Sequence, residues 1–410
     1  MSIPHRHGPN LASFAQLLAL ATVLFALLPA ARAAALLALG EVVLFGSFAA
    51  GSGEAHGFSA QAYARYAMAL MLQLLPGRAP TLAVVGISIA VCSKTYSALV
   101  RVRRPPLPRL DGRIVVVTGS SAGIGQETAT QLLELGATVL FACRSEARAK
   151  AALAAACSQS GAPPSRAAFV PLDLASCASV VDCAAAVARA GDGRCDVLVC
   201  NAGLLHPQRT LTKEGWEANL ACHALGHHLL AKLLLPLLRA SPSGGRVVSV
   251  SSTLHKTARA AELLADPMSE QRYAMFDAYA RSKLAQIALT NELQRREASA
   301  GSGVVCVSLH PGNVITEVTR EMPRPVQLAY RAVAPLIRFG APSLHDGAAT
   351  SVYAAAARPP SLTAGASSTS LRGAYLERCE RAMPHLDAAD EAVGRAVWEL
   401  AERLLAPWLK

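Results

Sequence analysis

The sequence predicts an α/β domain with a doubly wound parallel sheet of about seven strands, preceded by an α-helical membrane region. From residue 113 onward, short apolar runs alternate with helical patterns, and a glycine-rich turn follows the first of these runs. The residues before this domain include long apolar segments. We divide the chain into a hydrophobic membrane-anchor region of two to four helices at 1–105, the α/β domain at 106–385 and an amphipathic C-terminal helix at 386–410.

The N-terminal region contains two good candidates for membrane spans. Residues 11–30 carry no charge over a length that matches a spanning helix, and residues 79–100 form a second such segment. A cleaved secretory signal is an alternative for the first, because residues 31–33 resemble a cleavage site. The apolar segments 33–50 and 63–75 each contain a charged residue. The sequence therefore leaves two, three or four spans open.

Positive charge is concentrated in the same region. Residues 1–110 hold nine basic and two acidic residues, which accounts for +7 of the net charge of +11. An arginine cluster directly follows the second span (Arg101, Arg103, Arg104 and Arg109). Such a cluster stays on the cytosolic side, so we expect a cytosolic α/β domain, by default on the endoplasmic reticulum, with a plastid or mitochondrial envelope as the alternatives. The charge pattern favours a lipid bilayer as partner and argues against nucleic acid.

The ten cysteines form no C-x-x-C pair, so the sequence predicts no metal site. Several lie in apolar runs, such as Cys200 in DVLVC and Cys306 in GVVCVSL. We expect buried free thiols that act as small hydrophobic groups, which fits a reducing compartment.

A glycine-rich turn links the first predicted strand to a helix. The β-branched run at 114–117 is typical of a buried parallel strand, and Gly119, Gly123 and Gly125 follow it. Glycines allow the backbone to approach a pyrophosphate, and a helix opening at about Ile124 would direct its free amide groups at the phosphates. The alternative is an ordinary strand–loop–helix connection.

The end of the second predicted strand, 138–143, favours NADP(H) as the cofactor. An acidic residue at this position would bind the adenosine ribose hydroxyls, whereas a basic residue favours a 2′-phosphate. The chain has Arg144 there and no acidic residue before Glu146. The alternative is a solvated arginine. Further strands are expected at 169–172, 195–200, 246–251, 304–309 and about 373–376.

The motifs in this region resemble the short-chain dehydrogenase/reductase superfamily. They occur in the family's order: TGSSAGIG at 118–125, DL at 173–174, NAG at 201–203, SS at 251–252, YARSK at 279–283 and HPG at 310–312. Other segments resemble the retinol-dehydrogenase-like branch with its membrane-anchored polyprenol and retinoid enzymes: ACRS at 142–145, LGHHLL at 225–230, GAATSVYAA at 347–355 and GAYLERC at 373–379. The resemblance covers about two-thirds of the chain and implies a Rossmann fold.

The resemblance also implies the residues that hold the cofactor. Asp173 would contact the adenine, Asn201 would steady the neighbouring strand, and the segment after the sixth strand would close over the nicotinamide. The full set is Gly119, Ser121, Gly123, Ile124, Gly125, Arg144, Asp173, Leu174, Asn201, Ala202, Gly203, Tyr279, Lys283, Pro311, Gly312 and Thr316.

Tyr279 and Lys283 are four residues apart and so lie on one face of a helix. An ammonium group near a tyrosine favours the phenolate, and we therefore expect Lys283 to lower the pKa of Tyr279. Tyr279 then serves as acid or base, and Ser252 donates a hydrogen bond to the substrate oxygen. By the resemblance, Lys283 also bonds the nicotinamide ribose.

One catalytic position departs from the family. The family has an asparagine that holds a water in a proton relay, and His223 occupies its place here. A histidine keeps the backbone carbonyl and can itself relay protons. Activity is therefore expected, with a weakened enzyme as the alternative.

Apolar runs at 326–330 and 334–337 suggest a lipophilic substrate entering from the bilayer, or a helix packed on its own domain. For the C-terminal amphipathic helix, core packing, homodimer contact and membrane contact remain open. The sequence thus predicts a membrane-anchored, NADP(H)-dependent oxidoreductase of lipid metabolism, acting on a retinoid-, sterol- or polyprenol-like alcohol or carbonyl. The alternative is a membrane-tethered NADP(H)-binding regulator with weak or no turnover.

Overall fold

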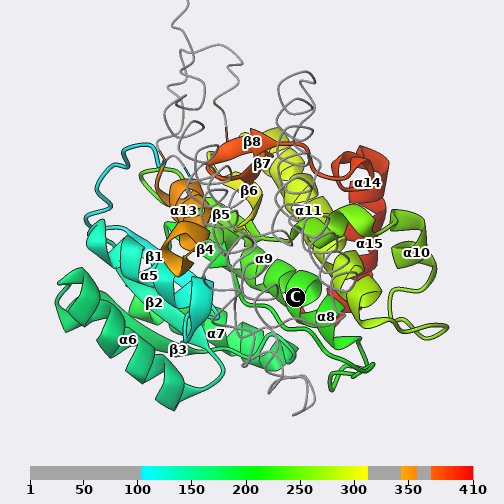
Figure 1. The fold of residues 1–410 in the computed structure, drawn as a ribbon, viewed down its shortest axis with the longest axis horizontal. Coiled ribbons are helices and arrows are strands. Elements are labelled where there is room, and N and C mark those ends of the chain that lie inside the picture. The colour runs from blue at the N-terminus through cyan, green and yellow to red at the C-terminus, as the bar shows by residue number, and fades with distance from the viewer. Residues whose placement is uncertain (1–101, 103, 313–342, 358–370, 410) are drawn as a thin grey trace, which may run out of the picture. The chain divides into compact units, whose positions relative to one another are not determined.

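In a computed structural model, the described residues are 102, 104–312, 343–357 and 371–409. They form one eight-stranded sheet with the order β3-β2-β1-β4-β5-β6-β7-β8 (Figure 1). Every neighbouring pair is parallel except the last, β7 with β8. The strands are β1 (Ile114–Thr118), β2 (Thr138–Cys143), β3 (Ala167–Pro171), β4 (Val197–Cys200), β5 (Arg246–Val250), β6 (Val305–His310), β7 (Tyr375–Glu377) and β8 (Glu380–Ala382).

The parallel Rossmann-type sheet confirms the predicted fold class of the α/β domain. The predicted strand count was one too few, because β8 returns from β7 through a tight turn and adds an antiparallel edge. Arg378 and Cys379 form this turn with φ of 55° and 63°, which is a conformation that usually takes glycine or asparagine. Neither the turn residues nor the three-residue strand carries a local signal for a hairpin.

Helices cover both faces of the sheet (Figure 1). One face packs against α5 (Gly123–Glu134), α6 (Glu146–Ser160) and α13 (Leu344–Ala356). The other packs against α7 (Cys177–Ala190), α9 (Gly226–Arg239) and α11 (Met275–Ser299). The shorter elements are η1 (Pro164–Arg166), α8 (Ala218–Leu220), η2 (Ala221–Leu225), η3 (Thr253–Thr257), α10 (Ala260–Ala265), α14 (Leu386–Ala389) and η5 (Ala406–Trp408), and α15 (Glu391–Leu405) lies near the C-terminus.

Strand β1 shows why an unbroken apolar run suits the centre of this sheet. Its side chains alternate between the two faces, so Val115 and Val117 enter the core under α5, while Val116 enters the core under α9. All three are fully buried. The strand order reverses at β1: strands β2 and β3 lie on one side of it, and β4 and the later strands lie on the other. A ligand site is expected at the carboxyl ends of the strands at this point.

The C-terminal segment packs on the domain that it follows. Helix α15 buries Val397, Trp398 and Leu405 in the same core as α9 and α11. The sequence left core packing, homodimer contact and membrane contact open for this helix. The structure shows core packing for the face that carries these three residues. Among the described residues, the stretch Ala218–Arg239 is long and apolar enough to cross a membrane, but 78% of its apolar window is buried inside the protein. The apolar segments before residue 101 lie outside the described residues.

Nine of the ten cysteines fall in the described residues, and all nine are free and buried. Burial raises the pKa of the Cys200 thiol to about 12, so that it stays protonated. The prediction of buried thiols acting as small hydrophobic groups is therefore confirmed for these residues.

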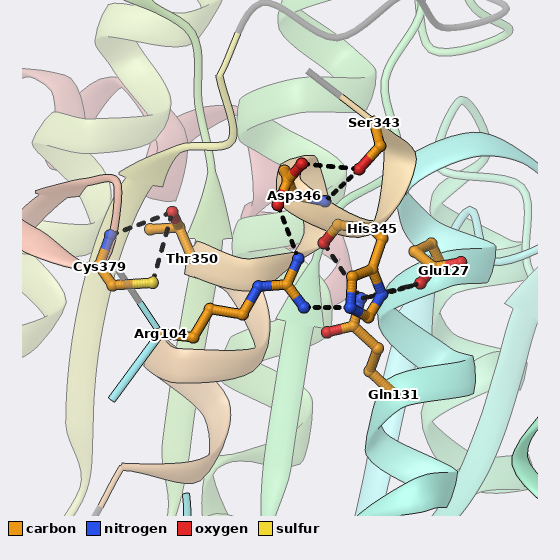
Figure 2. Close-up of polar contacts among 8 residues, drawn as sticks. All are labelled: Arg104, Glu127, Gln131, Ser343, His345, Asp346, Thr350 and Cys379. Carbon is orange, nitrogen blue, oxygen red and sulfur yellow. Dashed lines mark hydrogen bonds and ion pairs between the residues drawn. The ribbon is translucent and has the colours of Figure 1, made fainter. Parts of the chain in front are cut away.

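Arg104 ties the start of the domain to two helices, as Figure 2 shows. Its guanidinium group contacts the His345 ring and donates a hydrogen bond to Asp346 Oδ1 at 2.9 Å, both at the start of α13. The His345 ring in turn lies 2.8 Å from Glu127 Oε1 on α5. The Arg104 and Asp346 side chains are about one-third exposed, so each pair contributes roughly 1 kcal/mol or less. The contacts fix the path of the chain more than they stabilise the fold.

A buried arginine closes the far end of α13. Arg246 on β5 donates hydrogen bonds to Ala354 O at 2.6 Å and to Ala357 O at 2.7 Å, and only 4% of the residue is exposed. These carbonyls end a helix and have no partner within it. The guanidinium group thus joins the sheet to α13.

We expect Arg246→Met to lower the free energy of unfolding by about 2–4 kcal/mol, because two buried carbonyls lose their donors. Arg395→Met is the matched control, since Arg395 pairs with Glu391 on an exposed face and should cost less than about 0.5 kcal/mol. Denaturant titration in detergent measures both values. Equal losses would contradict the role of Arg246.

Candidate active site

The glycine turn between β1 and α5 packs directly against the segment that follows β4. A Cβ on Gly119 would lie 2.8 Å from Ala202 Cα, and one on Gly125 would lie 2.3 Å from Asn201 Nδ2. Side chains at these two positions would therefore push the strand ends apart. Gly123 differs, because it needs its positive φ of 59° while a Cβ there would meet nothing within 4 Å. It borders open space at the start of α5.

Helix α5 begins at this open space without a side-chain cap. Its N-cap residue is Ala122, so the first amide groups of the helix have no capping acceptor. Free amides and the positive end of the helix dipole suit a diphosphate. The residues present therefore fit the phosphates of a nicotinamide dinucleotide, with Ser121 and Ile124 on either side of the open position. Pro311 and Gly312 directly follow β6, as expected, whereas Thr316 lies outside the described residues.

Thr118 fixes the two strand ends relative to each other. Its hydroxyl oxygen accepts hydrogen bonds from the amides of Asn201 and Ala202, both at 2.9 Å. The Asn201 side chain returns a hydrogen bond from Nδ2 to Thr118 O at 2.9 Å. Asn201 thus steadies the turn through the backbone of β1.

Arg144 lies beside this turn, two residues beyond Ala142, whose carbonyl accepts a hydrogen bond from Gly119 N. The Arg144 side chain is exposed and forms no hydrogen bond or ion pair with any described residue. The next acidic residue, Glu146, is paired with Lys150 on α6 at 2.7 Å. A free cation is therefore available at the end of β2. On the far side of β2, Asp173 follows β3, where its Oδ1 accepts a hydrogen bond from Ala175 N at 3.0 Å.

Ser252, Tyr279 and Lys283 come together from two elements. Ser252 follows β5 as the N-cap of η3, where its hydroxyl oxygen accepts a hydrogen bond from Leu254 N at 3.3 Å and so keeps its own proton available. Tyr279 and Lys283 lie on α11, with Lys283 Nζ 5.8 Å from the centre of the Tyr279 ring. Ser251 joins the elements by donating a hydrogen bond to Lys283 O at 3.1 Å.

The expectation that Lys283 lowers the pKa of Tyr279 is wrong for the structure described here. Desolvation raises the pKa of Tyr279 to about 12, opposed by a hydrogen bond from Ser252 that lowers it. Lys283 Nζ instead donates hydrogen bonds to Val250 O at 2.9 Å and to Gln286 Oε1 at 3.1 Å. Burial also lowers the pKa of Lys283 to about 7, which reduces the charge that it could offer to a phenolate.

His223 is fully buried in η2, a single π-helical turn between α8 and α9. Its Nε2 accepts a hydrogen bond from Leu204 N at 3.0 Å, so the ring proton is on Nδ1, which lies 2.8 Å from Ser282 Oγ. The Ser282 hydroxyl donates to Tyr279 O at 2.7 Å. Desolvation, with the nearby charge of Lys283, lowers the pKa of His223 well below its usual value. His223 is therefore a neutral residue with both ring nitrogens bonded.

Sequence reasoning missed the residues that hold these groups. Gln286 contacts the Lys283 ammonium, and Ser282 and Leu204 hold His223. His227 holds the His223 carbonyl, since its Nδ1 lies 3.2 Å from that oxygen. A Cβ on Gly203 would lie 3.2 Å from His223 Nε2, a tight contact that favours glycine as the third residue of the NAG motif. Gly203, His227 and Ser282 fall within the motifs NAG, LGHHLL and YARSK, whereas no quoted motif contains Leu204 or Gln286.

A family model for short chain dehydrogenase matches residues 113–326. The chain belongs to the short-chain dehydrogenase/reductase family. It is 37% identical to polyprenol dehydrogenase from Mus musculus over 323 residues, which covers 78% of this chain and 92% of that protein. It is 36% identical to retinol dehydrogenase 14 from Mus musculus, covering 72% of this chain and 86% of the relative. An uncharacterized protein from Mycobacterium paratuberculosis has a similar crystal structure, with a TM-score of 0.57, 30% identity and coverage of 73% and 96%.

Short-chain dehydrogenases use a nicotinamide dinucleotide, which supplies or accepts the hydride when bound. The residues of this chain would hold it by the glycine turn, the start of α5, Asn201 and Lys283. The Ser252 hydroxyl, which donates a hydrogen bond to Tyr279 in this structure, would donate instead to a substrate oxygen and hold it beside Tyr279. In this arrangement Tyr279 would give its proton to that oxygen during carbonyl reduction and take it back during alcohol oxidation, as the family resemblance implies. With a raised pKa, Tyr279 is protonated at neutral pH, the form that reduction requires.

The lowered pKa of Lys283 predicts how stability depends on pH. Between about pH 7 and 10.5 the unfolded chain keeps this proton while the folded chain has lost it, so that raising the pH in this range favours the folded state. We expect the difference in Tm between cofactor-free wild type and Lys283→Met to shift in favour of wild type from pH 7 to pH 9. A difference that stays constant or shifts the other way would show that Lys283 is solvated.

Proposed function

We propose that the protein is a membrane-anchored, NADP(H)-dependent oxidoreductase that interconverts a lipophilic alcohol and its aldehyde or ketone. The observation that carries the proposal is the convergence of Ser252, Tyr279 and Lys283 at the carboxyl edge of the sheet, where Ser252 donates a hydrogen bond to Tyr279 and Lys283 lies beside the Tyr279 ring. Each group has a role in moving one proton at a substrate oxygen next to a hydride carrier.

The preference for NADP(H) rests on Arg144. A guanidinium group that has no hydrogen-bond or ion-pair partner among the described residues, next to the glycine turn, suits the 2′-phosphate of this cofactor. Glu146, the next acidic residue in the sequence, is paired with Lys150 and not with Arg144.

The substrate class rests on the relatives and on the composition of the chain. Two similar proteins are a polyprenol dehydrogenase and a retinol dehydrogenase, so a retinoid-, sterol- or polyprenol-like compound is the class to test. The apolar segments of residues 1–100 support delivery of such a substrate from the bilayer. The arginines that follow these segments favour a cytosolic domain, by default on the endoplasmic reticulum.

A second candidate function is a membrane-tethered regulator that binds NADP(H) and turns over poorly. The state of His223 favours it, because the His223 carbonyl and both ring nitrogens already have partners. Tight cofactor binding without turnover on a panel of apolar carbonyls would support this alternative.

We expect Arg144→Asp to weaken NADPH binding by about 100-fold or more, because a carboxylate would repel the 2′-phosphate. The affinity for NADH should change less than about 3-fold, since NADH lacks that group. Fluorescence titration with both cofactors measures the two constants. Equal weakening of both would refute the phosphate-binding role.

Tyr279→Phe should reduce turnover by about 1,000-fold or more while leaving the Kd for NADPH within about 3-fold of wild type. The variant loses only the hydroxyl that donates the proton. Steady-state reduction of a retinoid aldehyde, followed by NADPH absorbance, gives the rate. An unchanged rate would contradict the assignment of Tyr279 as the proton donor.

A further inference from the structure

We propose that His255 is a positioning residue for Ser252, and that the C-terminal segment 385–388 holds His255 in place for that role. His255 is the third residue of η3 and lies three residues after Ser252. It is fully buried. Its two ring nitrogens connect the backbone of Ser252 to a segment that lies 130 residues further along the chain.

Both ring nitrogens of His255 are in use. The backbone N–H of His385 donates a hydrogen bond to Nε2 at 3.0 Å, so Nε2 carries no proton and the neutral ring has its proton on Nδ1. That Nδ1 lies 2.6 Å from Ser252 O and donates to it. The ring therefore links the Ser252 carbonyl to the backbone of residue 385.

The ring is also held from the side and kept neutral. The Tyr375 ring on β7 meets it edge-on, with 5.1 Å between the ring centres. Burial lowers the pKa of His255 to about 4, while the neighbouring charges of Lys256, Glu377 and His385 act in opposing directions. The Nδ1 donor thus persists at physiological pH.

A second contact holds the same segment against the loop that follows Ser252. Asp387 Oδ2 accepts a hydrogen bond from Ala260 N, the first residue of α10, at 2.7 Å. Segment 385–388 also reaches the helix of Tyr279 and Lys283, because Asn291 Nδ2 on α11 donates to Ala388 O at 2.9 Å. The segment therefore touches both elements that carry catalytic side chains.

This arrangement explains how Ser252 faces Tyr279 although Ser252 lies in a loop. Ser251 ties the start of the loop to Lys283 O, and His255 ties the Ser252 carbonyl from the other side. Because a Ser252 hydrogen bond lowers the pKa of Tyr279, a displaced Ser252 should both slow the reaction and raise that pKa. A residue that only stabilised the fold would not move the pH profile.

Three variants of His255 and His228 test the Ser252 end of the link. His255→Leu removes both hydrogen bonds at a similar side-chain volume, whereas the smaller His255→Asn keeps an N–H donor near the position of Nδ1. His228→Leu is the matched control, because His228 is also a buried histidine. It lies within hydrogen-bond distance of Glu402 on α15 and makes an edge-to-face contact with the Trp398 ring.

We expect His255→Leu to lower kcat by about 10- to 100-fold and to move the apparent pKa for alcohol oxidation to higher pH, with the Kd for NADPH unchanged. His255→Asn should stay within about 5-fold of wild type, and His228→Leu should leave kcat and the pH profile unchanged. Wild-type values for His255→Leu, or equal losses for Leu and Asn, would overturn the proposal.

Two variants of His385 test the other end without changing His255. The φ of His385 is −58°, which proline adopts, so His385→Pro removes only the N–H donor and the imidazole. His385→Ala removes the imidazole, which caps α14, and keeps the donor. The proline variant should fall in kcat by several-fold relative to the alanine variant. Identical rates would show that the N–H of residue 385 does not hold His255.

The kinetic tests rest on the proposed oxidoreductase function, and hydrogen exchange does not. In His255→Leu the amide of residue 385 loses its acceptor, and we expect peptides covering 383–390 to exchange about 10-fold faster or more than in wild type and in His228→Leu. Unchanged exchange would overturn the link itself. Faster exchange together with a wild type that reduces no apolar carbonyl would support the link and count against the proposed function.

Discussion

The geometry of the site depends on one hydroxyl group, that of Thr118 at the end of β1. It accepts the amides of Asn201 and Ala202 and so sets the spacing between the glycine turn and the end of β4. It also lies 2.9 Å from His227 Nε2, and the other nitrogen of that ring holds the His223 carbonyl in the π-helical turn. Because the Thr118 hydroxyl both accepts and donates hydrogen bonds, it fixes the glycine turn relative to the π-helical turn that carries His223. The close approach of Gly119 to Ala202 is possible only within this spacing.

Neutral histidines build much of the polar interior near this site. Burial lowers the pKa of His223, of His227 to about 3 and of His255 to about 4, so that each keeps one donor and one acceptor at physiological pH. Each ring uses these two groups to join elements that are distant in the sequence. His223 is one of these connecting histidines, because its two ring nitrogens contact Leu204 and Ser282. The His223 ring, which by the family resemblance takes the place of an asparagine, therefore acts first as a structural connector, and any proton relay through it would have to break an existing hydrogen bond.

Local pattern was enough to predict the strands at the centre of the sheet and the pairing of Tyr279 with Lys283, because both follow from spacing along one element. The Lys283 contact with Val250 O and the His255 link to residue 385 depend on where distant segments pack, and no local signal marks them. The same reason explains the error about Tyr279. The four-residue spacing predicted that the Lys283 ammonium lies near Tyr279, but the pKa of Tyr279 is set mainly by desolvation in the assembled core. The hairpin of β7 and β8 was missed because its turn uses Arg378 and Cys379.

The measurement that tests the central claim most directly is NADPH-dependent reduction of a retinoid aldehyde by the full-length protein in detergent, with His223→Asn alongside. If His223 is an accepted replacement held as a structural connector, wild type turns over and the variant stays within about 10-fold of it. If wild type is silent and the variant turns over, the chain is a cofactor-binding protein whose proton relay has been lost, and the proposed oxidoreductase function is contradicted.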